Sequence, residues 1–338
     1  MKELWFRRLV RIELLLIFLV ILAGSVVRMT GSGMGCPDWP QCFGYMIPPT
    51  EESQVLWTAG KEYSDGQMIV HADAMYSANG DFTSGDEYNP ENWTKYTKHD
   101  YAIFNPTHTW VEYINRLLGA LSGLPMVLLL VLSLTEIRRK PSYTLYSAIG
   151  LFLLGFEAWL GKEVVDGNLI PGQITYHMLG AFAIVMVLAL FLNTLRGGKL
   201  KQLPIPRGLI FIALVLMLIQ TVLGTQVREQ VDGLTKMFGD DASRDGWISK
   251  LDFMIYVHRS ASLVVTGLIF YLWYKTKKAG QFLKFMNGAF AMVMLSTLTG
   301  AILFYFDIPK VLQPVHLLLS AGIIGTLMFG LTLREKDA

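Results

Sequence analysis

Long apolar runs of about 20 residues alternate with short polar segments along most of this 338-residue chain. A helix needs about that many residues to cross a bilayer. The pattern predicts eight membrane-spanning helices, at residues 12–29, 112–134, 143–161, 174–194, 208–228, 253–274, 285–305 and 312–333. The first run has the basic start of a signal peptide. However, seven more runs follow and no small-residue cleavage site is evident, so we expect a retained helix. The expected fold class is an all-α membrane protein.

Basic residues cluster at alternate ends of these runs and predict the orientation. They precede the first run, follow the second, separate the fourth from the fifth and the sixth from the seventh, and follow the eighth. Because basic residues favour the cytoplasmic side, both termini are expected inside, with the loops at 30–110, 162–172, 229–252 and 307–311 outside. The net charge of only +2 gives no reason to expect a nucleic-acid partner, and the expected surroundings are a lipid bilayer.

The same chemical features recur in the two halves of the chain. Three pairs of positions correspond in the same order: Arg28 with Arg228, Asn115 with His258, and His177 with His316. Both of the last histidines follow a glycine by 16 positions. The repeat predicts two pseudo-symmetric four-helix bundles of parallel topology, residues 1–200 and 201–338, with a long outside insertion at about 30–110.

Two histidines in the second half predict a haem site. His258 and His316 begin the sixth and eighth helices at similar depth, near the outer ends. Neutral imidazole is a standard axial ligand of haem iron, and a haem with two histidine ligands fits between such helices. The neighbouring Arg259 is a candidate partner for a haem propionate. The alternatives are hydrogen-bonding histidines that join helices and an arginine that anchors the membrane interface.

The first half differs from the second at one of these positions. His177 matches His316, but Asn115 stands where His258 stands, and an amide oxygen is a poor iron ligand. One histidine ligand suits a substrate site better than a fixed electron carrier. Glu112 shares a helix face with Asn115 and could move protons. Its alternative role is an interfacial acid at a helix N-terminus.

Two more polar residues of the spans are expected to join helices. Glu157 is expected at the interface or in a hydrogen bond, with a proton path as the alternative. Gln220 is expected to form a hydrogen bond between helices rather than to contact a ligand.

The two cysteines, Cys36 and Cys42, lie in the first outside loop. An outside compartment permits disulfides, and the two prolines between them could bring the sulfurs together. The sequence therefore predicts a disulfide, with two unpaired thiols as the alternative. A metal site is less favoured because no histidine lies near them in sequence.

Several of these segments together resemble the motifs of the haem A synthase family. The resemblance is carried by residues 23–34 with 36–40, 112–116, 176–182, 257–259 and 314–316. It covers nearly the whole chain apart from the long outside loop. Members of the family oxidise the C8 methyl group of haem O to a formyl group, which gives haem A for cytochrome oxidase, with water as the expected oxygen source.

The resemblance implies a role for each matching residue. A haem b would be bound by His258 and His316 as an electron relay, and the substrate haem by His177, with Glu112 as the catalytic residue. Asn115, Arg28 and Arg116 are then expected in the substrate pocket, and Arg228 and Arg259 are candidates for haem propionates. Cys36 and Cys42 match the family's outside cysteine pair, which is either redox-active or structural.

The resemblance also implies a setting. We expect a multi-pass protein of the bacterial inner membrane, with the histidine-bearing helix ends toward the outside. A haem O synthase is the expected upstream partner, the electron acceptor is unknown, and a homo-oligomer is a further expectation.

Two departures from the family stand out. Asn115 replaces the usual first-half histidine, and the loop at 229–252 has no cysteines. The insertion at about 45–105 has no recognisable chemistry, and an outer cap or a partner-binding segment are the alternatives for it.

Two rival functions stay open: a haem b electron-transfer subunit that takes electrons from quinol, and a transporter built on the repeat. A symmetric carrier would favour histidine at all four positions, whereas a transporter predicts no bound haem.

Overall fold

Eight long helices form most of the protein. The computed structural model describes residues 2–97, 104–167, 172–239, 242–281 and 283–335. The helices are α1 Lys2–Met29, α2 Pro106–Leu134, α3 Pro141–Asp166, α4 Gln173–Arg196, α5 Arg207–Phe238, α6 Met254–Lys278, α7 Lys284–Tyr305 and α8 Leu312–Leu331. Each overlaps one predicted span, so the expected all-α class is confirmed.

The helices carry the apolar surface of a membrane protein. Among the described residues, α1, α2 and α4 to α8 are long and apolar enough to cross a membrane. Large apolar side chains such as Leu124, Phe152 and Leu263 are more than half exposed on the helix surfaces. Extensive apolar surface is unfavourable in water but matches lipid chains. The protein is therefore an integral membrane protein.

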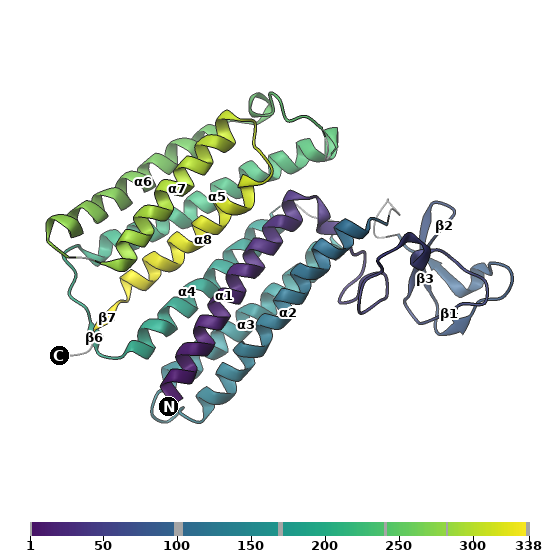
Figure 1. Ribbon diagram of the computed structural model, residues 1–338, viewed down its shortest axis with the longest axis horizontal. Helices are drawn as coiled ribbons and strands as arrows, with labels where there is room; N and C mark the ends of the chain where they lie inside the picture. The colour runs from purple at the N-terminus through teal and green to yellow at the C-terminus, as the bar shows by residue number, and fades with distance from the viewer. Residues whose placement is uncertain (1, 98–103, 168–171, 240–241, 282, 336–338) are drawn as a thin grey trace.

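Helices α1 to α4 lie together, and α5 to α8 lie beside them (Figure 1). Helix α8 packs against α4 and α1 as well as against α5 and α7, so it joins the two groups. Its approach to α4 is close, because a Cβ added at Gly325 would lie 2.7 Å from a methyl carbon of Val185. The main apolar core fills the space where the helices meet and includes Ile184, Ile323 and Leu327.

Proline and asparagine set the helix starts near the site. Asn105 accepts a hydrogen bond from His108 N at 3.1 Å through its side chain, and Pro106 follows at the first helical position. This is the favoured chemistry of a helix N-terminus. Helix α3 also begins with a proline, Pro141. The short turn expected near 307–311 is confirmed, since it separates α7 from α8.

Two of the predicted loops are shorter than expected. Helix α5 continues to Phe238, so the loop predicted at 229–252 is wrong over its first ten residues. The extension is held because Val231 packs with Trp247 and Leu251, and Asp232 pairs with Arg228 one turn earlier. Helix α3 likewise runs to Asp166 into the turn predicted at 162–172, of which 168–171 lie outside the described residues.

Both chain termini lie at one end of the helices (Figure 1). Lys2 Nζ lies 2.7 Å from Glu136 Oε1 at the end of α2, and Glu3 pairs with Lys140 at the start of α3. A short antiparallel pair, β6 Lys199–Leu200 and β7 Arg334–Glu335, ties the segment after α4 to the end of α8. The basic clusters of the sequence therefore meet at this end.

The segment between α1 and α2 forms a small β unit at the opposite end (Figure 1), which was not predicted. Its strands are β1 Glu62–Tyr63, β2 Met68–His71, β3 Ala74–Ala78, β4 Phe82–Thr83 and β5 Trp93–Lys95. β2, β3 and β5 form one antiparallel sheet, and β1 pairs with β4. Tyr63, Ile69 and Trp93 form an apolar core between them.

Glu13 gives a test of the packing in α1. Its side chain is fully buried, and neither carboxyl oxygen has a hydrogen-bond partner in the described part of the chain. A buried polar group without a partner costs about 1–3 kcal/mol. We expect Glu13→Met to raise the unfolding midpoint in detergent, and Leu15→Met, at an exposed site on the same helix, to leave it unchanged. A lower midpoint for Glu13→Met would contradict this packing.

Candidate functional site

His258 on α6 and His316 on α8 face each other. Their ring centroids are 6.3 Å apart, and the ring planes cross at 75°. A glycine from a neighbouring helix lies against the Cε1 edge of each ring. A Cβ at Gly224 of α5 would lie 2.9 Å from His258 Cε1, and one at Gly300 of α7 would lie 3.2 Å from His316 Cε1. Larger residues at these two positions would displace the rings.

Both rings are held by polar contacts at Nδ1. The Gln220 amide nitrogen lies 3.0 Å from His258 Nδ1 and donates to the His258 carbonyl at 2.8 Å. This confirms the predicted interhelical role of Gln220. Thr299 Oγ1 lies 3.0 Å from His316 Nδ1, and Ser296 Oγ lies 3.5 Å from it. Within the described residues Nε2 of neither ring makes such a contact, so Nε2 is the nitrogen available to a metal.

The spacing of the two rings fits a haem iron. Metal–imidazole bonds are about 2 Å long, so an iron atom between two Nε2 atoms separates the ring centroids by roughly 6 Å. The centroids are 6.3 Å apart. Contacts at Nδ1 also orient metal-binding histidines and fix which nitrogen faces the metal. The donor set and its spacing therefore fit an iron with two histidine ligands.

The first half arranges the matching residues differently. Asn115 on α2 points its Oδ1 at Gly24 of α1, where an added Cβ would lie 3.5 Å away. That oxygen is buried and has no hydrogen-bond partner among the described residues. His177 on α4 has Nδ1 2.6 Å from Glu157 Oε2 on α3, which satisfies the expectation of a polar contact for Glu157. A buried amide oxygen without a partner is the kind of group that a ligand satisfies.

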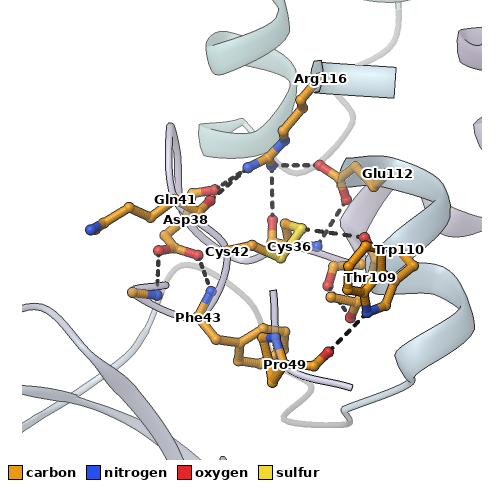
Figure 2. Close-up of a disulfide and its surroundings, with 12 residues drawn as sticks. Cys36, Asp38, Gln41, Cys42, Phe43, Pro49, Thr109, Trp110, Glu112 and Arg116 are labelled. Atoms are coloured by element: carbon orange, nitrogen blue, oxygen red, sulfur yellow. Dashed lines mark hydrogen bonds and ion pairs between the residues drawn. A yellow bond between two sulfur atoms is a disulfide. The ribbon is translucent and has the colours of Figure 1, made fainter. Parts of the chain in front are cut away.

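Glu112 is buried beneath the disulfide loop (Figure 2), with only 5% of its surface exposed. The backbone N–H of Cys36 donates to Glu112 Oε2 at 2.8 Å. Arg116, one turn later on α2, lies 2.5 Å from Oε1. The carboxylate is therefore held by one backbone donor and one guanidinium, a stronger constraint than a free interfacial acid would have.

Arg116 ties α2 to the same loop (Figure 2). Its guanidinium donates to the carbonyl oxygens of Asp38 and Gln41, each at 2.7 Å, and to that of Cys36 at 3.3 Å. The Cys36–Cys42 disulfide, which the sequence predicts, closes this loop and is confirmed. Both cysteines are buried. The loop is therefore shaped by the disulfide and held on α2 by Arg116.

Asp38 organises the loop from within. Its carboxylate accepts hydrogen bonds from Phe43 N at 2.6 Å and Gly44 N at 2.7 Å. Burial raises the pKa of the Asp38 carboxyl, although these two hydrogen bonds and the charge of Arg116 act to lower it. Gly44 has a φ of 76°, and a Cβ there would collide with the backbone of Gln67, so only glycine fits.

Arg28 and Arg228 meet at a single carboxylate. Arg28 Nη2 lies 2.5 Å and Arg228 Nη2 lies 2.7 Å from the two oxygens of Asp232. Arg228 also donates to the Arg28 carbonyl at 2.8 Å and to the side chain of Gln313 on α8. The structure thus brings together one predicted pocket residue, at the end of α1, and one predicted propionate partner, within α5.

Arg259 takes a different position. Its guanidinium lies 4.6 Å from the ring centroid of Phe304 and 5.5 Å from that of Tyr256. Cation–π contacts of this kind suit a residue at the membrane interface. This geometry matches the alternative role given to Arg259 by the sequence.

Two functional-site contacts were missed in the sequence. Asp232 lay in a predicted loop, although its spacing of four residues from Arg228 is the signal of a helical ion pair. The partner of Glu157 was not identified, because the sequence of α3 or of α4 alone does not determine how the two helices are rotated against each other.

Known proteins resemble this chain over most of its length. A family model described as "Cytochrome oxidase assembly protein" (COX15-CtaA) matches residues 7–79 and 84–328. A protein of Flavobacterium psychrophilum named heme A synthase is 22% identical, with 94% of each chain aligned. One of the same name from Paracoccus denitrificans is 22% identical over 98% of this chain and 87% of its own. Another, from Shewanella oneidensis, is 27% identical, and the aligned region covers 55% of this chain and 44% of that protein.

The shared carboxylate of Asp232 predicts a stability effect. Asp232→Asn would leave the guanidiniums of Arg28 and Arg228 close together without their common counter-charge. Because the three side chains are still 17–29% exposed, we expect a loss of about 1–2 kcal/mol, less than for a fully buried pair. Asp245→Asn at an exposed site is the matched control. Thermal unfolding in detergent measures both, and equal midpoints would contradict the bridging role.

Burial of the disulfide predicts slow reduction. Because Cys36 and Cys42 are 0% and 1% exposed, a thiol reagent must wait for the loop to open. We expect dithiothreitol to leave the bond intact in the folded protein and to reduce it after denaturation, as measured by maleimide mass-tagging. Rapid reduction of the folded protein would instead support a redox-active pair.

Proposed function

The chain belongs to the COX15-CtaA family of cytochrome oxidase assembly proteins, and on that premise we propose that it is a haem A synthase. In this reaction the C8 methyl group of haem O and one water molecule give a formyl group, four protons and four electrons. The product is haem A, which serves cytochrome oxidase. The relatives named heme A synthase support the proposal, although they are only 21–27% identical.

The observation that carries the proposal is one difference between two similar halves. His258 and His316 face each other and are each held at Nδ1. At the matching positions of the first half stand Asn115 and His177, and Glu112 lies one turn before Asn115. A symmetric carrier with two haems would favour histidine at all four positions. A site with one histidine, an amide and a buried carboxylate suits a haem that enters, reacts and leaves.

The second half is proposed to hold the resident cofactor. A haem b ligated by His258 and His316 would supply a one-electron relay between the substrate and an external electron acceptor. Gln220 and Thr299 would keep the two imidazoles in place by their contacts at Nδ1.

The first half is proposed to bind haem O. His177 of α4 would bind the iron of haem O, and Asn115 of α2 would line the same pocket. Arg28 and Arg228, which meet at Asp232, are the proposed cationic partners for carboxylates of the bound haems. Arg259 keeps its interfacial contacts in this proposal.

Glu112 is the proposed catalytic acid–base residue. Its two oxygens contact Cys36 N and Arg116, so the carboxylate is fixed in position without being exposed to bulk solvent. It accepts protons released during the oxidation, which is the role of a positioned general base. The disulfide loop serves this residue structurally by presenting the Cys36 N–H.

The distribution of basic residues supports a proposed orientation in the membrane. We propose that the basic end, with both termini, faces the cytoplasm and that the disulfide loop faces the outside of a bacterial inner membrane. The halves 1–200 and 201–338 are then parallel repeats. Since haem O is itself a modified haem, a haem O synthase must supply the substrate.

Haem analysis tests the function directly. The protein is co-expressed with a haem O synthase, and the extracted haems are separated by chromatography. We expect haem A with the unaltered protein and at least a hundredfold less with Glu112→Gln, because general bases contribute about 10²–10⁴-fold to rates. Glu91→Gln on the exposed outside segment is the matched control and should leave haem A unchanged.

The rival functions give different results in the same experiment. Bound haem b without haem A in the unaltered protein would favour an electron-transfer subunit. A purified protein without any haem would favour a transporter. Either result would overturn the proposed activity.

His258→Ala tests the resident haem site. We expect this variant to lose the low-spin absorption of haem b, because iron then has one histidine ligand instead of two. His108→Ala, in the first turn of α2, is the control. Absorption spectra of the reduced proteins measure the effect, and an unchanged spectrum in His258→Ala would refute the ligand assignment.

A further inference from the structure

Glu157 is a buried carboxylate in the outer part of α3 that the proposed reaction does not use. Its side chain is 10% exposed, and Oε2 lies 2.6 Å from His177 Nδ1 on α4. Oε1 is buried and has no hydrogen-bond partner among the described residues. An acid buried among membrane helices is costly, and such a residue is by default a candidate for a function.

The contact to Glu157 determines which edge of His177 is open. The His177 side chain is 41% exposed, yet its Nδ1 atom is buried, and among the described residues this atom has the close ion-pair contact to Glu157 in place of a hydrogen bond of regular geometry. The exposed part of the ring therefore lies away from Glu157, on the side that includes Nε2. A histidine held in this way presents one nitrogen to a ligand and keeps the other for the protein.

Gly180 makes room for the carboxylate. It lies one turn after His177 on α4, and a Cβ at this position would overlap the carboxyl group of Glu157. Glycine at position 180 of α4 therefore leaves the space between α3 and α4 that the long acidic side chain of Glu157 occupies.

The second half has the opposite combination. Ser296 and His316 are 20 residues apart, as are Glu157 and His177. Where the first half has Gly180, three residues after its histidine, the second half has Leu319. A serine hydroxyl beside His316 thus replaces the carboxylate beside His177, and a leucine stands in the sequence where the first half has Gly180. Of Glu157 and Ser296, only Glu157 provides a negative charge to its histidine.

We propose, on the basis of the proposed function, that Glu157 is a positioning residue for the substrate haem. It holds the His177 ring with Nε2 toward haem O and makes this imidazole a stronger electron donor than His316. A carboxylate at the remote nitrogen orients a metal-binding histidine and raises its basicity. The hydroxyl groups of Ser296 and Thr299 hold His316 without that charge.

The charge matters more in the first half because of Asn115. The amide leaves His177 as the one histidine at this site, so the strength of a single bond determines how the substrate is held. A charged group beside a metal-binding histidine is one of the means by which proteins adjust a haem iron. A stronger donor raises electron density at the substrate haem, which favours removal of electrons from it.

The test uses the full-length protein loaded with haem O and reduced. Resonance Raman spectroscopy measures the iron–histidine stretching band of a haem with one histidine ligand. We expect Glu157→Gln to shift this band to lower frequency and to raise the midpoint potential of haem O. Binding of haem O should weaken by about 10–100-fold, the range seen when outer-shell partners of metal ligands are removed.

A double variant separates the effect of the Glu157 charge on His177 from the effect of packing between α3 and α4. Glu157→Ser with Gly180→Leu introduces the residues of the second half and places a leucine side chain where the carboxyl group of Glu157 lies against Gly180. It should fold and show the same shift of the band as Glu157→Gln. Ser296→Ala is the matched control and should leave the haem O band unchanged.

The outcomes distinguish this proposal from the proposed function. An unchanged band and potential in both Glu157 variants would overturn the positioning role. An unaltered protein that binds haem O and shows the shift on mutation, but makes no haem A, would overturn the proposed function alone. A protein that does not retain haem O would overturn both.

Discussion

Polar groups between membrane helices are satisfied by other groups of the protein, and contacts of this kind hold His177, His258 and His316. At each of these three histidines the partner comes from a neighbouring helix. Gln220 of α5 contacts His258 of α6, Thr299 of α7 contacts His316 of α8, and Glu157 of α3 contacts His177 of α4. Each contact fixes the rotation of one helix against its neighbour. The candidate ligands are therefore positioned by the same contacts that determine the packing.

The polar groups of the disulfide loop, at the end of the helices, are also satisfied by a neighbouring helix. Three backbone carbonyls of the loop accept from Arg116, and one backbone N–H donates to Glu112. The loop has no regular strand or long helix to satisfy these groups, so α2 supplies the partners. The position of the Glu112 carboxylate and the closure of the disulfide loop thus depend on one short stretch of contacts.

The helices could be predicted because hydropathy over 20 residues is a strong local signal, and the disulfide because only two cysteines exist. The helical extension past Arg228 could not be, since it depends on Val231 packing against Trp247 and on Asp232 reaching Arg28, which is 204 positions away. The strands of the insertion are two to five residues long and give little periodicity. For the site, residue types were visible in the repeat, but the pairing of Glu157 with His177 required the helix rotations.

The residues beside His177 also constrain which substitutions positions 157 and 180 accept. With Glu157 in place, a leucine at position 180 would collide with the carboxylate, because even a Cβ overlaps it. With Gly180 in place, a serine at 157 would leave a void and remove the partner of His177. To exchange one combination for the other, both positions must therefore change together, or one of them must pass through a third residue. Such coupling would preserve the chemical difference between the two histidine sites.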